Sequence, residues 1–194
     1  MKVGVLALQG AFVEHMAMLA RLGVATAEIR LPEQLADLDG LIIPGGESTT
    51  IGKLAEKYGF MEPLRQFAQE KGIWGTCAGM IFLAKDIGRE QPLLGVMDIV
   101  VERNAFGRQV DSFVMPLEVP VLGENGDGKR PFPGVFIRAP RLVAAKGEAQ
   151  IITRLPDGTA VAAQQGKLLA TAFHPELTDD DRFHRYFLRL LQHK

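Results

Sequence analysis

The sequence contains a single cysteine and has no excess of charge of either sign. Its 194 residues include 22 Lys and Arg against 23 Asp and Glu, which gives a formal net charge of -1. One cysteine cannot form an internal disulfide, so the disulfide framework of small secreted proteins is excluded. The balanced charge, without any basic run, gives no reason to expect nucleic acid or an anionic membrane as a partner.

Long apolar stretches are also missing. No run approaches the roughly 20 apolar residues that a helix needs to cross a bilayer. The apolar run after Lys2 ends after about six residues, which is shorter than the apolar core of a signal peptide. No small-residue cleavage site follows it. We therefore expect a cytoplasmic protein that folds as one domain over residues 1–194.

The first half of the chain alternates short apolar runs with segments of helical periodicity. This alternation predicts an α/β fold, in which helices cover both faces of a parallel sheet. Expected strands lie at 2–8, 24–30, 41–43 and 73–76, and expected helices at 11–22, from 48 or 49 to 58, 61–71 and 78–85. Later strands are expected at 95–102, 112–119, 135–138, 150–153, 159–165 and 168–173, a surface loop at 123–133, and a last helix at 179–192.

Cys77 lies in a segment that is typical of a reactive residue. A short apolar strand leads into Gly75-Thr76-Cys77-Ala78-Gly79, and an expected helix follows. The order is that of a nucleophile elbow, where a sharp strand-to-helix turn pushes the reactive side chain out of the sheet. The glycines allow close packing around a strained residue. The alternative is that Cys77 is a small buried apolar side chain, as free cysteine often is.

His174 is the histidine best placed to act as a base for Cys77. It follows the last apolar run, and open α/β sheets place their sites at the C-terminal ends of parallel strands. Cys77 and His174 can therefore meet at one edge of the sheet. Glu176, two residues further on, could orient the imidazole as the third member of a triad.

The other three histidines are expected to have no catalytic role. His15 falls on the first expected helix and is interpreted as a surface or core-edge residue. His184 lies on the last helix and His193 near the chain end, and both are interpreted as solvated.

A glycine pair, Gly45-Gly46, ends the third expected strand. Such a turn before a helix is a weak signal, since it could be a tight turn or a phosphate cradle. No Gly-x-Gly-x-x-Gly or Walker pattern accompanies it, which argues against a nucleotide. Beside the Cys77 and His174 segments, the turn can supply amides for an oxyanion. The peptide between two glycines can also flip at low steric cost.

Six segments together resemble one family, the glutaminase subunit of pyridoxal 5'-phosphate synthase, which belongs to the class I, or triad, glutamine amidotransferases. They lie at 7–10, 44–50, 75–79, 101–109, 134–140 and 173–178. The cysteine and histidine segments alone would indicate only the broad amidotransferase class. The Glu-Ser-Thr-Thr and Glu-Arg-Asn-Ala-Phe-Gly-Arg-Gln segments narrow the resemblance to this family.

The resemblance implies a fold, a reaction and a partner. The fold is a flavodoxin-like three-layer α/β/α sandwich with a mostly parallel central sheet and extra antiparallel strands. The reaction is hydrolysis of L-glutamine to L-glutamate and ammonia. The synthase subunit would use the ammonia, with a pentose phosphate and a triose phosphate, to build the vitamin B6 ring. No cofactor is implied, and the sequence offers no cluster with metal-ligand spacing.

The resemblance also implies roles for individual residues. The catalytic triad is Cys77, His174 and Glu176, and the backbone amides of Gly46 and Ala78 bind the oxyanion. Arginine can grip a carboxylate through two parallel hydrogen bonds, and a glutamate can attract the ammonium of free glutamine. The substrate is expected to contact Gly46, Glu47, Ser48, Arg103, Ile137 and Arg138.

Other interpretations of these residues are open. Without the resemblance, Arg103 and Arg138 would be read as solvated charges at strand edges. Arg108 is expected to be structural. Another triad amidotransferase, such as the subunit serving imidazole glycerol phosphate synthesis, would not explain Glu-Ser-Thr-Thr. A flavodoxin-like cysteine hydrolase or stress protein would not explain His-Pro-Glu after the last strand. A regulatory binding module without catalysis would not need the complete triad.

Overall fold

The structure, a computed structural model, describes residues 1–103, 112–123 and 130–192. Some expectations fall outside these residues: the role of Arg108, the end of the 101–109 segment, positions 124–129 of the expected loop, and the solvation of His193. No helix of the described residues is both long and apolar enough to cross a membrane.

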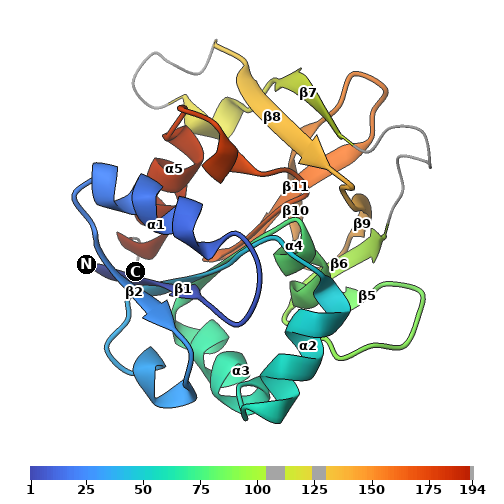
Figure 1. Cartoon of the computed structure of the whole chain (residues 1–194). Coiled ribbons are helices and arrows are strands. Elements are labelled where there is room, and N and C mark those ends of the chain that lie inside the picture. Colours follow the sequence, from blue (N-terminus) through green and yellow to red (C-terminus); the bar gives the residue numbers. More distant parts are fainter. Residues whose placement is uncertain (104–111, 124–129, 193–194) are drawn as a thin grey trace.

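A curled sheet runs through the centre of the molecule (Figure 1). Its strand order is β2-β1-β3-β4-β12-β11-β9-β6-β5, and β10 pairs with β11 outside this path. The pairings from β2 to β12 are parallel, and those joining β12, β11, β9 and β6 are antiparallel. The ten strands are β1 (Lys2–Leu6), β2 (Ala25–Ile29), β3 (Gly40–Ile43), β4 (Gly72–Thr76), β5 (Ala84–Asp86), β6 (Met97–Glu102), β9 (Arg141–Ala145), β10 (Gln150–Arg154), β11 (Ala160–Gln165) and β12 (Leu168–Thr171).

Helices cover both faces of the parallel part of the sheet. In Figure 1, α1 and α5 lie on one face, and α2 and α3 lie on the other. The expected three-layer α/β/α arrangement with a mostly parallel sheet and extra antiparallel strands is therefore confirmed. The helices are α1 (Phe12–Arg21), α2 (Ser48–Lys57), α3 (Met61–Glu70), α4 (Ala78–Leu83) and α5 (Arg182–Gln192), with short 3₁₀ turns at Pro32–Leu35, Pro120–Leu122 and Pro175–Leu177.

Several boundaries and two strands, β5 and β9, differ from the sequence-based expectation. The strand expected at 135–138 begins at Phe132, which is fully buried and lies inside the surface loop expected at 123–133. The helix expected at 78–85 ends at Leu83, because Ala84 becomes extended and pairs with β6 as part of β5. The last helix begins at Arg182 and not near 179. Strand β9 was not expected, although residues 142–145 form an apolar run. Only Leu142 of its five residues is buried, and its backbone pairing with β6 holds it in the sheet.

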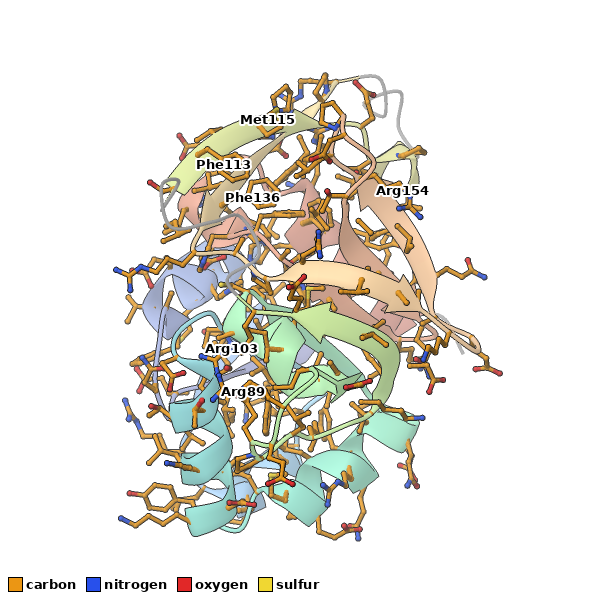
Figure 2. All side chains as sticks on the ribbon, turned by 90° about the vertical axis from the view of Figure 1, so that its right-hand side faces the viewer. Arg89, Arg103, Phe113, Met115, Phe136 and Arg154 are labelled. Atoms are coloured by element: carbon orange, nitrogen blue, oxygen red, sulfur yellow. The ribbon has the colours of Figure 1, made fainter. Side chains whose placement is uncertain are left out.

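A two-stranded ribbon, β7 (Ser112–Leu117) and β8 (Phe132–Ile137), stands apart from the main sheet. Its Phe113 and Phe136 rings stack with centroids 4.7 Å apart (Figure 2). Phe136 also packs against Phe173 of the core, with centroids 5.5 Å apart. The amide of His174 donates to the carbonyl of Val135 at 2.8 Å. These contacts attach the end of β8 to the segment that carries His174.

Candidate functional site

Cys77 occupies the sharp turn between β4 and α4, as the sequence predicts. Its backbone has φ 49° and ψ -104°, a left-handed region that is strained for a residue with a side chain. The amide of Cys77 donates to the carbonyl of Thr171 at 2.8 Å, which ties the turn to β12. A Cβ atom on Gly79 would lie 2.1 Å from the carbonyl oxygen of Ile43. The turn therefore needs glycine beside it to pack against β3.

His174 follows β12 and lies on the same edge of the sheet as Cys77. Its Nδ1 is 2.7 Å from Oε1 of Glu176. Gly45 approaches both His174 and Cys77: a Cβ atom there would lie 2.5 Å from His174 Cε1 and 3.4 Å from Cys77 Cβ. The structure thus brings together the cysteine, the histidine, the carboxylate and the glycine turn that the sequence places far apart.

Hydrogen bonds and charge outweigh burial at this cluster. Burial acts to lower the pKa of His174, but hydrogen bonding to Cys77 and to Glu176, together with the charge on both, raises it to about 10. Burial acts to raise the pKa of Glu176, yet His15 and the hydrogen bond from His174 hold it below its ordinary value. The pair therefore favours a carboxylate beside a protonated imidazole.

A cleft of about 640 Å³ opens over Cys77. All predicted site residues line it except Glu176, which lies behind His174 with 6% of its surface exposed. The cleft also involves residues to which the sequence analysis gave no role. They are Gln9, Gly10, Ala11, Ile81 and Leu177.

Glu47 and Arg103 face each other across one end of the cleft. Arg103, which follows β6 and lies beside α2 (Figure 2), places its Nη2 3.0 Å from Oε1 of Glu47. Burial acts to raise the pKa of Glu47, but hydrogen bonds from Thr50 and Thr49, and then Arg103, lower it to about 2. Gln91 accepts from Arg103 at 2.8 Å, a contact that no sequence motif indicated.

The cap of α2 corrects one expectation. Glu47, and not Ser48 or Thr49, caps the helix, and its carboxylate accepts from the amides of Thr49 and Thr50. The extended backbone of Glu47 directs its side chain back to these amides. The hydroxyl of Ser48 is buried instead and accepts from the side chain of Gln91 at 3.3 Å.

The end of β8 forms another wall of the cleft. The carbonyl of Ile137 lies 3.8 Å from Sγ of Cys77 and can accept from it when the sulfur is in its thiol form. Arg138 has φ 44°, so the chain turns sharply there and directs the exposed arginine away from the strand. Ile137 therefore reaches the cleft from the last position of β8, and Arg138 from the bend that follows it.

The interpretation of His15 and His184 is wrong. Both side chains are fully buried, and Nδ1 of His15 lies 3.0 Å from Nε2 of His184. Ring-edge contacts to Trp74, with centroids 5.6 and 4.9 Å away, complete their surroundings. Helical spacing could have revealed this, since His15 shares the buried face of α1 with Met18 and Leu19.

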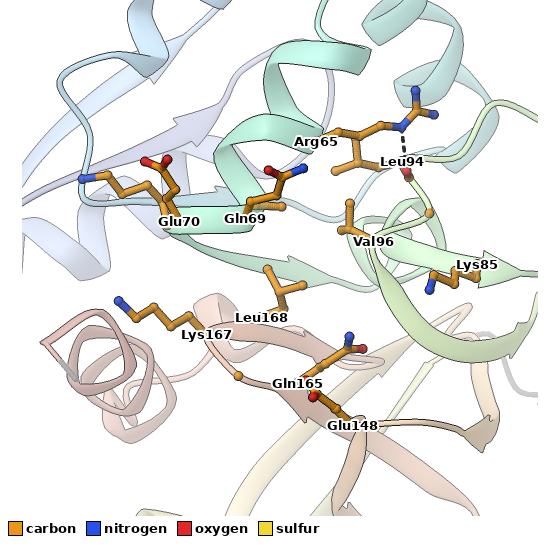
Figure 3. Close-up of a pocket in the computed structure, with 14 residues that line it drawn as sticks. Arg65, Gln69, Glu70, Lys85, Leu94, Val96, Glu148, Gln165, Lys167 and Leu168 are labelled. Carbon is orange, nitrogen blue, oxygen red and sulfur yellow. Dashed lines mark hydrogen bonds between the residues drawn. The ribbon is translucent and has the colours of Figure 1, made fainter. Parts of the chain in front are cut away.

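Other regions offer less chemistry. Figure 3 shows a second depression, of about 660 Å³, where β4 and β12 begin. It is lined by side chains such as Lys71, Lys167 and Glu148, and by neither cysteine nor histidine among the described residues. Among all the described residues, no group of three or more His, Cys, Asp or Glu is arranged to hold a metal ion.

The cleft therefore belongs to the class of cysteine sites that can form a covalent acyl intermediate, carried on a three-layer α/β fold. The family model that matches the chain narrows this class. The SNO glutamine amidotransferase family matches residues 5–193, and the chain belongs to this family.

Individual relatives agree with the family. The chain is 62% identical to the pyridoxal 5'-phosphate synthase subunit PdxT of Herpetosiphon aurantiacus, over 98% of this chain and 100% of that protein. It is 54% identical to PdxT of Chloroflexus aggregans, again over 98% of this chain and 100% of that protein. A crystal structure of a glutamine amidotransferase matches with a TM-score of 0.90 and 51% identity, over 98% of this chain and 99% of that one. PurLQS from Thermotoga maritima, at 15% identity and a TM-score of 0.73, shares the fold over 98% of each chain.

Proposed function

We propose that this protein hydrolyses L-glutamine to L-glutamate and ammonia, and that a synthase subunit uses the ammonia to make pyridoxal 5'-phosphate. One observation carries the proposal. A strained cysteine beside a histidine–carboxylate pair lines the cleft of a chain that matches PdxT over its whole length. We assign the catalytic triad to Cys77, His174 and Glu176.

The reaction follows from the placement of these groups. The sulfur of Cys77 attacks the side-chain amide carbon of glutamine, and a tetrahedral oxyanion forms. His174 gives its proton to the departing nitrogen, so that ammonia leaves and a glutamyl thioester remains. His174 then takes a proton from water as the water attacks the thioester, which releases glutamate and restores the Cys77 thiolate beside a protonated His174. An imidazole with a raised pKa suits the first transfer, because it holds its proton at neutral pH.

We assign the oxyanion contacts to the amides of Gly46 and Ala78. The carbonyl of Gly45 accepts from the amide of Ala11 at 3.0 Å, on the side of β1. In a trans peptide the amide points opposite to the carbonyl. The Gly46 amide is therefore directed to the other side of β3, where β4 and Cys77 lie. One such donor is worth about 2.7–4 kcal/mol in comparable sites.

We assign the ends of glutamine to Arg103 and Glu47. These two side chains pair with each other across the cleft, and their charges are those that the substrate's carboxylate and ammonium require. A zwitterion can part the pair without leaving either charge unmatched. Ser48, Ile137 and Arg138 line the same cleft and are assigned to substrate binding with them.

The synthase subunit is expected to dock over the mouth of the cleft and to raise turnover. Ile137 and Leu177 expose 38% and 43% of their surface there. The side-chain oxygen of Gln9, on the same rim, accepts a hydrogen bond from the amide of Glu47 at 2.8 Å. A partner that contacts this rim can favour the Gly45-Gly46 peptide orientation that directs the amide at the oxyanion.

The test is glutamate release by the chain alone and with a PdxT-cognate synthase subunit. Turnover should rise at least about tenfold with the synthase, equivalent to about 1.4 kcal/mol. 6-Diazo-5-oxonorleucine should label Cys77, and the Cys77→Ala variant should release no glutamate. Appreciable turnover by Cys77→Ala would refute the assigned nucleophile. Equal rates with and without the synthase would refute the activation, though not the triad.

A further inference from the structure

A chain of buried polar side chains continues from Glu176 away from the cleft. Oε1 of Glu176 faces His174 at 2.7 Å, whereas Oε2 faces Nε2 of His15 at 3.3 Å. The same Nε2 lies 3.2 Å from Oγ1 of Thr76, and Nδ1 of His15 lies 3.0 Å from His184. Glu176 is thus held between one histidine that lines the cleft and one that is fully buried.

The hydrogen-bonding options fix the tautomers of the two buried histidines. An ionised Glu176 can only accept, so Nε2 of His15 carries its proton. That nitrogen is hydrogen-bonded to Thr76, and Oε2, which has no hydrogen-bond partner among the described residues, faces it at 3.3 Å as an electrostatic contact. Nδ1 of His15 then accepts from Nε2 of His184. This leaves Nδ1 of His184, which has no hydrogen-bond partner among the described residues, as a bare acceptor. The reverse arrangement would bury an unpaired N–H at His184 and turn a lone pair of His15 towards the carboxylate.

The electrostatics favour neutral rings at His15 and His184. Burial lowers the pKa of His15, although Glu176 acts in the opposite direction, with smaller effects from His174 and Glu14. Burial, then His15 and Arg21, holds the pKa of His184 well below its ordinary value. His15 therefore acts on Glu176 through the dipole of the N–H that faces Oε2 at 3.3 Å, and not as a second full positive charge.

We propose that His15 is a positioning residue of the catalytic triad, and that it fixes the second oxygen of Glu176 so that the first stays directed at His174. The inference rests on the proposed function, because it concerns the carboxylate of the same triad. A carboxylate held at one oxygen can rotate about its last bond, whereas one held at both oxygens cannot. His184 supports this role from behind by holding His15 in the donating tautomer.

Three variants separate this role from simple packing. His15→Leu fills much of the same space and removes the donor. His15→Gln keeps a donor, because the end of its amide lies about where the imidazole Nε2 does. His15→Asn keeps the polarity, but its shorter side chain reaches only the Nδ1 position, which faces His184. The matched pair of Gln and Asn keeps the test decisive even where the Leu variant fails to fold.

The measurement is kcat and KM for glutamine, with the synthase present, across the acid limb of the pH profile. His15→Leu and His15→Asn should lower kcat about ten- to hundredfold with KM nearly unchanged, because Oε2 loses the N–H that faces it. Their acid limbs should move to higher pH, since Glu176 loses a group that lowers its pKa. His15→Gln should recover most of kcat. His184→Leu should lower the unfolding temperature, and it should lower kcat less than His15→Leu does.

The outcomes distinguish this inference from the proposed function. A wild-type complex that releases no glutamate refutes the proposed function. An active wild type with equal kcat in the Gln and Asn variants refutes the positioning role alone. The positioning role is likewise refuted if the losses appear in KM. It is also refuted if the variants rank in kcat in the same order as they rank in unfolding temperature.

Discussion

The parallel and antiparallel halves of the sheet supply different parts of the site. The parallel half carries Cys77 after β4, His174 after β12 and the glycine turn after β3, all held by close backbone contacts. The antiparallel half and the ribbon carry Arg103 after β6 and the bend at the end of β8. We propose that the catalytic groups lie where the backbone has little freedom, and that Arg103 and the end of β8 reach the substrate from the periphery, opposite Glu47 of the parallel half.

Loss of the base in the parallel half should have the largest effect. We expect His174→Asn to lower kcat by about 10⁴-fold or more, because triad members act as a unit. Glutamate release under saturating synthase measures this, with circular dichroism to verify the fold. The comparison between the halves fails if His174→Asn changes KM and leaves kcat intact.

Close packing in the parallel half can be tested without substituting a member of the triad. In Gly45→Ala, the new Cβ atom would meet the His174 ring at 2.5 Å and displace it. A misplacement of this kind can cost about 10²-fold in kcat. The same turnover assay applies. An unchanged kcat would mean that the turn has more freedom than its contacts indicate.

A substitution in the antiparallel half should instead weaken binding. We expect Arg103→Ala to raise KM for glutamine about tenfold while kcat stays close to wild type, since a charge-assisted hydrogen bond is lost. Arg154→Ala is the matched control, because Arg154 lies on β10 and donates to the carbonyl of Gly158 (Figure 2). Equal KM values in the two variants would contradict the assignment of Arg103.

The smallest effect concerns stability and pH. The folded protein raises the pKa of His174 from 6.5 to about 10. Its contribution to the free energy of unfolding is complete below pH 6.5 and is lost as pH rises through about 10. Over this window the unfolding temperature of the wild type should fall more than that of His174→Asn. Parallel slopes would show that the raised pKa does not stabilise the fold.

The sequence predicts the parallel half better than the antiparallel half. Apolar runs and glycine turns mark β1, β3 and β4, and Cys77 and His174 can be located from the strand ends alone. Strand β9 also contains an apolar run, at 142–145, but only Leu142 is buried, so the run does not indicate which face meets the core. Two contacts were not predicted from the sequence: the cap formed by Glu47 and the hydrogen bond between Arg103 and Gln91. Both depend on side chains that meet only in the folded chain.

The buried histidines illustrate the same limit within the better-predicted half. Taken singly, His15 and His184 are polar residues on amphipathic helices, and nothing marks them as partners across 169 positions of sequence. Only the packing of α1 and α5 on one face of the sheet brings them together behind Glu176 (Figure 1). Their spacing relative to Met18 and Phe187 could indicate burial, but not which polar group each would meet.

Trp74, the one tryptophan of the chain, stands edge-on to both buried histidines. Its indole nitrogen donates to Thr171 of β12 at 3.2 Å, and its ring is fully buried. Protonated imidazole quenches indole emission strongly, and neutral imidazole much less. The protein therefore carries an intrinsic optical probe of the charge on the network behind Glu176, free of background from any second indole.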